Sequence, residues 1–227
     1  MLKLGGLIKH SLKDYPGKIS CVIFTRGCDF RCPFCHNPGL IYSSGEEISF
    51  SDIVDYIDNS KDWLEGIAIT GGEPLLNYDI VDMLSFLKRK FKLPVKVDTN
   101  GNHPEMVDYI IKNKLTDFFA MDIKHELVKE KYDSITGINI NIDNLRQSIN
   151  LIENSGIDYV FRTTVIPGVH SVENIKNIKK SLIRPEKYTL QNFSNKNPFN
   201  PAYKEITPYT DTEFDEFKKT VNRGSAQ

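Results

Sequence analysis

Short apolar runs alternate with amphipathic stretches along most of the chain, and this alternation restricts the folds open to it. Strands separated by helices imply parallel pairing through crossover helices. The apolar runs predict six strands, at 19–24, 66–70, 95–99, 118–123, 159–165 and 188–191. The amphipathic stretches predict helices at 50–59, 78–90, 104–112, 143–154 and 172–183. The pattern therefore indicates an α/β protein with a parallel sheet.

The length of the chain narrows this class further. A closed barrel of eight strand–helix units usually takes about 250 residues, whereas this chain has 227. Six units with long loops suit that length, so we predict an incomplete (β/α)6 barrel of the TIM type, with parallel strands and one open side. A doubly wound open sheet is the alternative. We expect residues 1–223 to form a single domain and residues 224–227 to form a flexible tail.

Composition excludes several broad functions. The net charge is −1, which gives no bulk electrostatic reason to bind nucleic acid or a membrane surface. No apolar run approaches the roughly 20 residues that a membrane helix needs. Residues 1–10 lack the long apolar stretch of a signal peptide. We therefore expect a cytoplasmic protein without nucleic-acid or membrane partners.

Three of the four cysteines lie close together, directly after the first expected strand. Cys28, Cys32 and Cys35 have the spacing Cys-x3-Cys-x2-Cys. Clustered cysteines in a cytosolic chain typically bind metal or do redox chemistry. Iron–sulfur clusters normally take four cysteines, so three would leave one iron open to another ligand. A structural zinc site with His36 or Cys21 as fourth ligand is the alternative, although Cys21 suits a buried strand position.

Polar residues follow the carboxyl ends of the later expected strands, where parallel α/β folds bind ligands. Paired glycines before Glu73 would let the backbone approach a ligand, and Glu73 offers a carboxylate to an ammonium group. Lys124 or Arg162 could pair with a ligand carboxylate, and Asp122 could accept from an ammonium or ribose hydroxyl. Each motif alone is equally consistent with an ordinary turn, but together they suit a zwitterionic ligand.

The cysteine spacing and the sequence Gly71-Gly72-Glu73-Pro74 together resemble the signature of the radical S-adenosylmethionine (SAM) superfamily. The resemblance implies one [4Fe–4S] cluster, with three irons bound by Cys28, Cys32 and Cys35 and the fourth chelated by SAM. It further implies backbone contacts to the adenine from Phe34 and His36. The implied SAM-binding residues are Phe34, Cys35, His36, Gly71, Gly72, Glu73, Asn100, Asp122, Lys124 and Arg162.

Further motifs resemble the glycyl-radical-enzyme activases, among them pyruvate formate-lyase activase. These motifs are Asp14-Tyr15-Pro16-Gly17, Cys35-His36-Asn37, Asp98-Thr99-Asn100-Gly101, Asp122-Ile123-Lys124 and Val165-Ile166-Pro167-Gly168. The stretch 3–40 is most similar to activating proteins of anaerobic ribonucleoside-triphosphate reductase. The resemblance implies an oxidoreductase that reductively cleaves SAM to a 5′-deoxyadenosyl radical and abstracts hydrogen from a backbone glycine of a partner glycyl radical enzyme. It implies a flavodoxin or ferredoxin as electron donor.

The chain also departs from these activases. Several carry about eight extra cysteines for further clusters, but only Cys21 is left over here. Pyruvate formate-lyase activase has a histidine near SAM after its last barrel strand, and Gln191 or Asn192 would have to replace it. Its monovalent-cation site implies a similar site at Asp98, Thr99 and Asp122, unless Asp98 only caps a turn.

Two other functions remain open from the sequence. The first is a radical SAM enzyme acting on a small molecule, similar to 7-carboxy-7-deazaguanine synthase. The second is a non-enzymatic zinc-binding or electron-transfer module.

Overall fold

One sheet of seven strands organises the computed structural model, which describes residues 2–223. The strands lie in sequence order from β1 to β7; β2 to β7 pair in parallel, and β1 pairs antiparallel with β2. Their bounds are Leu4–Ser11 (β1), Ser20–Thr25 (β2), Gly66–Gly71 (β3), Val95–Thr99 (β4), Phe118–Asp122 (β5), Asp158–Val165 (β6) and Tyr188–Asn192 (β7). A doubly wound sheet reverses its strand order at a switch point, so this order excludes that alternative. It confirms the open (β/α)6 barrel.

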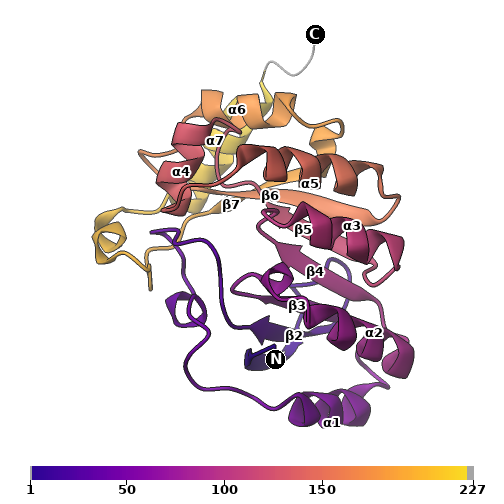
Figure 1. The fold of residues 1–227 in the computed structure, drawn as a ribbon. Coiled ribbons are helices and arrows are strands. Elements are labelled where there is room, and N and C mark those ends of the chain that lie inside the picture. Colours follow the sequence, from indigo (N-terminus) through magenta and orange to yellow (C-terminus); the bar gives the residue numbers. More distant parts are fainter. Residues whose placement is uncertain (1, 224–227) are drawn as a thin grey trace.

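Helices α1 to α6 lie between successive strands of the chain, and α7 follows β7. On the outer side of the sheet, α2, α3 and α5 lie side by side (Figure 1). Their bounds are Phe50–Ser60 (α1), Ile80–Phe91 (α2), Pro104–Lys112 (α3), Lys129–Thr136 (α4), Ile142–Asn154 (α5), Val172–Lys180 (α6) and Asp211–Asn222 (α7). Short 3-10 helices occupy Pro38–Leu40, Pro74–Leu76, Pro185–Lys187 and Pro201–Glu205. Within residues 2–223, none of the helices has the length and apolar character needed to cross a membrane.

The six predicted strands are all present, each with ends within one residue of the prediction. The last predicted helix ends three residues early, at Lys180, where Ser181 caps it before a turn leading to Pro185. Three elements were not predicted: β1, α4 and α7. Two glycines weaken the strand signal of β1, which gains its order from pairing with β2. The tail expected at 224–227 lies outside the described residues.

The two faces of the strands differ in character because side chains alternate along each strand. The outer face is apolar and packs under the helices; on β3 and β4 it carries the fully buried Ile67, Ile69, Val95 and Val97. The inner face, here called the lumen face, carries charged residues on β4 to β6. Asp98 and Asp122 lie near the carboxyl ends of β4 and β5, Arg162 lies opposite Asp122 on β6, and Lys96 lies nearer the amino end of β4.

The chain closes the rim of the incomplete barrel without a strand. The segment 193–210, which follows β7, folds back onto residues 26–42, here called the Cys loop (Figure 1). The backbone N–H of Phe199 donates to Cys35 O at 3.0 Å, and that of Asn200 donates to Pro33 O at 2.8 Å. The first and last parts of the barrel are thus joined above the lumen.

Candidate functional site

The Cys loop is held along its length by backbone hydrogen bonds. Gly27 N donates to Leu40 O and Cys28 N donates to Ile41 O, both at 2.9 Å, so that the loop closes on itself. Arg31 N donates to Thr136 O at 2.7 Å, which ties the middle of the loop to the end of α4. With the two bonds from the segment after β7, these backbone contacts position the loop that carries the three cysteines.

The paired glycines after β3 lie against the Cys loop. A Cβ on Gly72 would lie 2.0 Å from Gly27 O, and one on Gly71 would lie 2.3 Å from Thr25 O. Gly71 also has φ +124°, a conformation that favours glycine. Two hydrogen bonds join the same segments, Gly72 N to Thr25 O and Glu73 N to Gly27 O. At these two positions glycine is required by the close approach of the Cys-loop backbone.

The three cysteines of the loop are free thiols in an environment that disfavours their ionised form. Cys32 is buried, whereas Cys28 and Cys35 are partly exposed. Burial raises the pKa of Cys32 to about 12, although the nearby Lys124 ammonium lowers it. Burial also raises the pKa of Cys28 and of Cys35. A cationic inorganic centre would stabilise the three thiolates. The donor set therefore fits a cluster held by three cysteines.

Cys21 is separate from this loop. It is fully buried within β2, and burial raises the pKa of its thiol to about 12. It has the environment predicted for a small apolar side chain. Among residues 2–223, no three His, Cys, Asp or Glu side chains are grouped around one point so that they could hold a single metal ion. A four-iron cluster does not need such a group, because each cysteine binds a different iron.

Glu73 is almost fully buried and braces two loops. Its Oε1 accepts from Leu75 N at 3.0 Å and from Thr99 Oγ1 at 2.8 Å, and its Oε2 accepts from Asn100 N at 2.7 Å. Burial, and then the Asp29 carboxylate, raise the pKa of Glu73 to about 7, although the three donors lower it. Only one lone pair, on Oε2, stays available to a ligand.

Asp29 is a central residue of the site that the sequence did not indicate. Its carboxylate accepts from Asn100 Nδ2 and Asn102 Nδ2, both at 2.8 Å, and lies 3.1 Å from His103 Nε2. These hydrogen bonds outweigh burial and lower the pKa of Asp29; the Asp29 carboxylate in turn raises the pKa of His103 despite burial. The pair links the Cys loop to the loop after β4.

Five side chains of alternating charge form a row on the lumen face, here called the charge row. Its members, in order, are Lys96, Asp98, Arg162, Asp122 and Lys124. Arg162 Nη2 lies 3.2 Å from Asp98 Oδ2, and its Nε donates to Asp122 Oδ1 at 2.7 Å. Lys124 Nζ donates to Asp122 Oδ2 at 2.9 Å, and Lys96 Nζ is paired with Asp98 Oδ1.

The charge row contains four predicted site residues, Asp98, Asp122, Lys124 and Arg162, and one residue that sequence reasoning missed, Lys96. Lys96 is two residues before Asp98, so strand alternation places both on the lumen face. Charged residues at positions i and i+2 of an otherwise apolar strand were the signal that could have identified it. Burial alone would raise the pKa of Asp122, but Arg162 and Lys124 outweigh burial and hold that pKa well below its usual value.

Of the residues predicted to bind a monovalent cation, Asp98 and Asp122 lie on the charge row, but Thr99 does not. Thr99 Oγ1 donates to Glu73 and accepts from Gly101 N, on the outer side of β4. Asp98 is already paired with two protein cations, Lys96 and Arg162. The described contacts therefore do not bring the three predicted ligands together.

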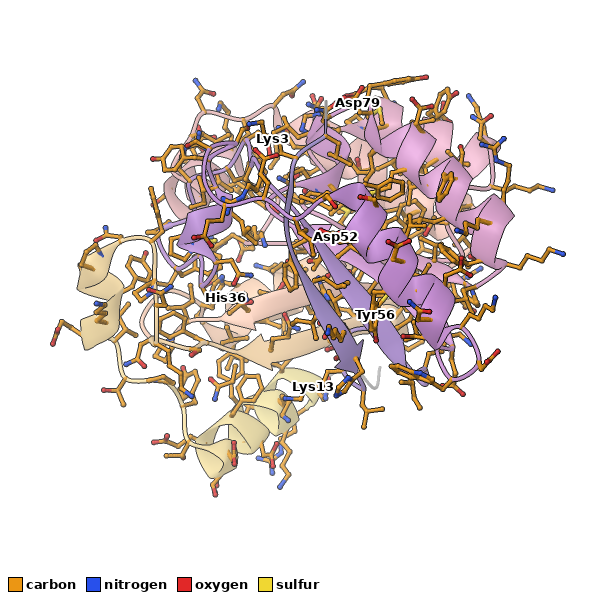
Figure 2. The ribbon with its side chains drawn as sticks, turned by 90° about the horizontal axis from the view of Figure 1, so that it is seen from below. Lys3, Lys13, His36, Asp52, Tyr56 and Asp79 are labelled. Atoms are coloured by element: carbon orange, nitrogen blue, oxygen red, sulfur yellow. The ribbon has the colours of Figure 1, made fainter. Side chains whose placement is uncertain are left out.

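Lys124 joins the charge row to the Cys loop. Its Nζ lies 5.9 Å from the centre of the Phe34 ring, and its charge lowers the pKa of Cys32. Burial, followed by the Lys124 charge, lowers the pKa of His36. In the view of Figure 2, His36 lies to the left of Asp52 and Tyr56 of α1. Lys124 therefore lies beside Phe34, and its charge reaches His36.

Strand β7 carries Gln191 and Asn192, the two candidates to replace the histidine that pyruvate formate-lyase activase has near SAM. Gln191 pairs with Thr164, two residues beyond Arg162, so Gln191 shares the lumen face with the charge row. Asn192 lies on the other face, and its Nδ2 donates to Tyr209 O at 2.6 Å. The geometry therefore favours Gln191.

Two buried histidines support the backbone of the site. The rings of His125 and His170 are stacked, with centroids 5.1 Å apart. His170 accepts at Nδ1 from Ile166 N, which assigns its proton to Nε2, and that nitrogen donates to Lys124 O at 2.9 Å. Burial lowers the pKa of His170 to about 4. The neutral ring therefore holds the Lys124 backbone in place.

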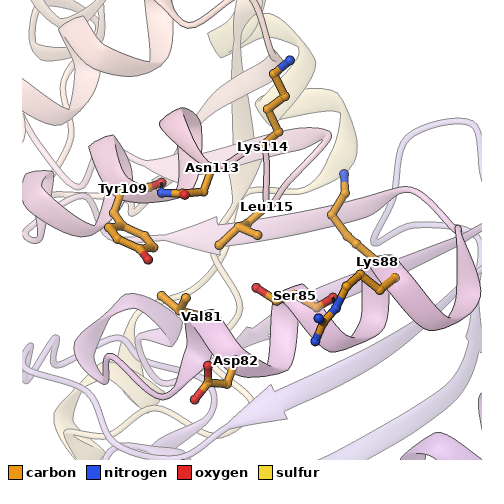
Figure 3. Close-up of a pocket in the computed structure, with 9 residues that line it drawn as sticks. Val81, Asp82, Ser85, Lys88, Tyr109, Asn113, Lys114 and Leu115 are labelled. Carbon is orange, nitrogen blue, oxygen red and sulfur yellow. Dashed lines mark hydrogen bonds between the residues drawn. The ribbon is translucent and has the colours of Figure 1, made fainter.

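A separate hollow of about 550 Å³ lies between α2 and α3 on the outer side of the sheet (Figure 3). Val81, Ser85 and Lys88 line it from α2, and Tyr109 lines it from α3. None of its lining residues belongs to the Cys loop or to the charge row. It is not part of the candidate site.

Comparisons with known proteins agree with this arrangement. Residues 22–182 match the Radical SAM superfamily. A protein of Methanocaldococcus jannaschii named as a glycyl-radical enzyme activating enzyme is 31% identical over 97% of this chain and 92% of its own length. The pyruvate formate-lyase-activating enzyme of Clostridium pasteurianum is 30% identical over 84% of this chain and 81% of its own length.

Solved structures share the fold. Streptococcus suis SuiB bound to its precursor peptide SuiA superposes with a TM-score of 0.69 at 18% identity, over 88% of this chain and 44% of that chain. The radical S-adenosylmethionine methyltransferase TsrM from Kitasatospora setae gives a TM-score of 0.58 at 13% identity, over 80% and 37% of the two chains.

Proposed function

The chain belongs to the radical SAM superfamily and, within it, to the glycyl-radical-enzyme activating enzymes, and from this premise we propose that its partner is an anaerobic ribonucleoside-triphosphate reductase. The observation that carries the proposal is the resemblance of the stretch 3–40 to the activating proteins of that reductase. This stretch contains β1 and most of the Cys loop. We further propose that the protein works in the cytosol, where cysteine thiols stay reduced.

In this proposal Cys28, Cys32 and Cys35 hold one [4Fe–4S] cluster, and SAM occupies the lumen between the Cys loop and the charge row. When bound, these groups supply the one-electron cleavage of SAM that leads to abstraction of hydrogen from a glycine of the partner. The protein binds the cofactors, orients them and excludes water. No side chain is needed as a general acid or base.

Two charged regions of the pocket suit the two ends of an amino acid group. Lys124, at the end of the charge row nearest Phe34, offers an ammonium to the SAM carboxylate. Oε2 of Glu73, which accepts from Asn100 N, keeps one lone pair for an ammonium. We propose that Arg162 and Asp122 support Lys124, that Asn100 orders the loop around Glu73, and that Phe34 and His36 contact the adenine.

The open side of the barrel supports a polypeptide substrate. β1 and β7 lie at opposite edges of the sheet, and the connection between them is confined to the rim. A partner loop that carries a glycine could enter between these edges, which a closed barrel would prevent. We propose a flavodoxin or ferredoxin as electron donor. A monovalent cation is left out of this proposal because Asp98 is already paired twice.

The test is an anaerobic activation assay. The enzyme is reconstituted with iron and sulfide, reduced, and mixed with SAM and either the anaerobic reductase or pyruvate formate-lyase from the same genome. We expect the electron paramagnetic resonance doublet of a glycyl radical with the reductase, and no doublet with its Gly→Ala variant. A doublet with pyruvate formate-lyase alone would refute the proposed partner. SAM cleavage without a doublet on any partner would refute glycine as the substrate.

A further inference from the structure

A buried ammonium group lies below the proposed SAM pocket and has no role in the function proposed so far. The side chain of Lys96 is 3% exposed, and its Nζ is paired with Asp98 Oδ1. Lysine is almost never fully buried unless it is paired. Burying a lysine in the middle of a sheet costs free energy, so we look for what its positive charge does there.

The rest of the charge row shows what that use is. Asp98 has one other cationic partner, Arg162, at 3.2 Å, while the shorter 2.7 Å bond of Arg162 goes to Asp122. Without Lys96, Asp98 would compete with Asp122 for Arg162. Asp122 would in turn draw more strongly on Lys124, its other partner at 2.9 Å. By pairing with Asp98, Lys96 allows Arg162 to pair mainly with Asp122. Lys124 is then held less strongly by Asp122 and can face the pocket.

The signs of the row lead to the same conclusion. Three cations alternate with two carboxylates, which leaves one net positive charge on the row. That charge matches one ligand carboxylate. Removing Lys96 would make the row neutral, and the pocket would lose the charge that attracts the ligand.

We propose that Lys96 is a built-in monovalent cation, whose ammonium occupies the place beside Asp98 that a bound metal cation would otherwise have to fill. It acts as a positioning residue: through Asp98 and Arg162 it orients Lys124 toward a carboxylate. The identity of that carboxylate as the one of SAM rests on the proposed function. Thr99 faces the outer side of β4, so the lumen face offers no complete set of oxygen ligands for a metal.

The test compares two variants in three salts. Lys96→Ala removes the ammonium and leaves space for an ion, whereas Lys96→Met removes the charge but fills the space. Melting temperature and SAM affinity are measured on the reconstituted enzyme in choline, sodium and potassium chloride at equal ionic strength. Lys112→Ala is the control, because Lys112 is 71% exposed and paired only at the surface.

We expect the wild type and Lys112→Ala to behave alike in all three salts. Lys96→Ala should lose melting temperature and about tenfold in SAM affinity in choline, and sodium, potassium or added ammonium should restore most of both. Lys96→Met should lose both and recover neither. The recovery is a readout that a purely structural packing role would not produce.

Three results would overturn the inference. A wild type that needs sodium or potassium for SAM binding would show a separate metal site. Lys96→Ala with unchanged SAM affinity in choline would show that the row does not need the charge. If Lys96→Ala does not fold in any salt while Lys96→Met folds and binds SAM normally, the role of Lys96 is packing. Failure to activate any partner, with the salt response intact, would refute only the proposed function.

Discussion

The Cys loop and the charge row face each other across the same lumen, but different interactions hold them. The Cys loop is braced by backbone hydrogen bonds, by hydrogen bonds from Arg26 and Arg31 to its carbonyl groups, and by glycines that allow backbone segments to touch. The charge row is held by ion pairs between side chains of three strands. The first arrangement depends on shape and the second on charge. Substitutions that add volume should therefore damage the loop, and substitutions that remove charge should damage the row.

The largest effect is expected where the loop meets the cluster. Replacing Cys28, Cys32 or Cys35 by Ala removes one of three ligands, and each variant should lose its iron and sulfide after anaerobic reconstitution. Cys21→Ala should keep near four irons per chain and lose only about 1 kcal/mol of stability, because Cys21 is a buried strand residue. A cluster retained in Cys32→Ala would contradict the assignment, and one zinc without sulfide in the wild type would favour a zinc site.

A single methyl group should break the shape of the loop. In Gly72→Ala the new Cβ would meet Gly27 O at 2.0 Å, so the backbone of one segment has to move. We expect a loss of about 3 kcal/mol in the free energy of unfolding, measured with urea, and poor cluster reconstitution. Gly39→Ala is the matched control, because its Cβ would meet nothing within 4 Å. Equal stabilities of the two variants would refute the close approach.

Removing one charge should weaken the row without changing its volume. Asp122→Asn leaves Arg162 and Lys124 each with a neutral partner. We expect a loss of about 2 kcal/mol in the free energy of unfolding and a weaker affinity for SAM. Asp108→Asn breaks an exposed pair with Lys112 and should cost less than about 0.5 kcal/mol. Similar losses in both variants would show that burial does not strengthen the row.

The smallest effect concerns the support behind the row and depends on pH. The pKa of His170 is about 4 in the folded protein and about 6.5 in the unfolded chain. Neutral His170 therefore favours the fold above pH 6.5, and this contribution falls as pH drops from 6.5 to 4, by at most about 1.4 kcal/mol per pH unit.

The raised pKa of Glu73 changes the free energy of unfolding in the opposite direction over the same pH range. The effect of His170 is therefore isolated by comparing the wild type with His170→Gln. Glu73 is present in both proteins, so its contribution cancels in the difference between their free energies of unfolding. We expect the advantage of the wild type to shrink between pH 7 and pH 5. A constant difference would mean that His170 does not titrate with a lowered pKa.

The same comparison explains how far the sequence predicted the molecule. The six parallel strands and five of the helices followed from apolar periodicity. The cysteine loop was recognisable because its spacing is local in the chain. α7 was missed although Thr210 and Glu213 form a capping box at its start. That signal was available in the sequence.

Local sequence patterns did not predict the contacts of Asp29 and Lys96. Asp29 meets Asn100, Asn102 and His103, which lie more than 70 residues away. Whether two strand residues pair depends on the register between strands, and here Asp122 pairs opposite Arg162. No local pattern encodes that register, so the charge row became visible only in the folded sheet.

The rim contacts have a consequence for the order of events during synthesis. The Cys loop receives two of its backbone hydrogen bonds from Phe199 and Asn200, near the other end of the chain. A ribosome adds about 5–20 residues per second, so the cysteines are exposed for many seconds before their last supports exist. Iron delivered early would meet an unfinished loop, whereas iron delivered after release would meet a finished one. Maturation should therefore depend on completion of translation.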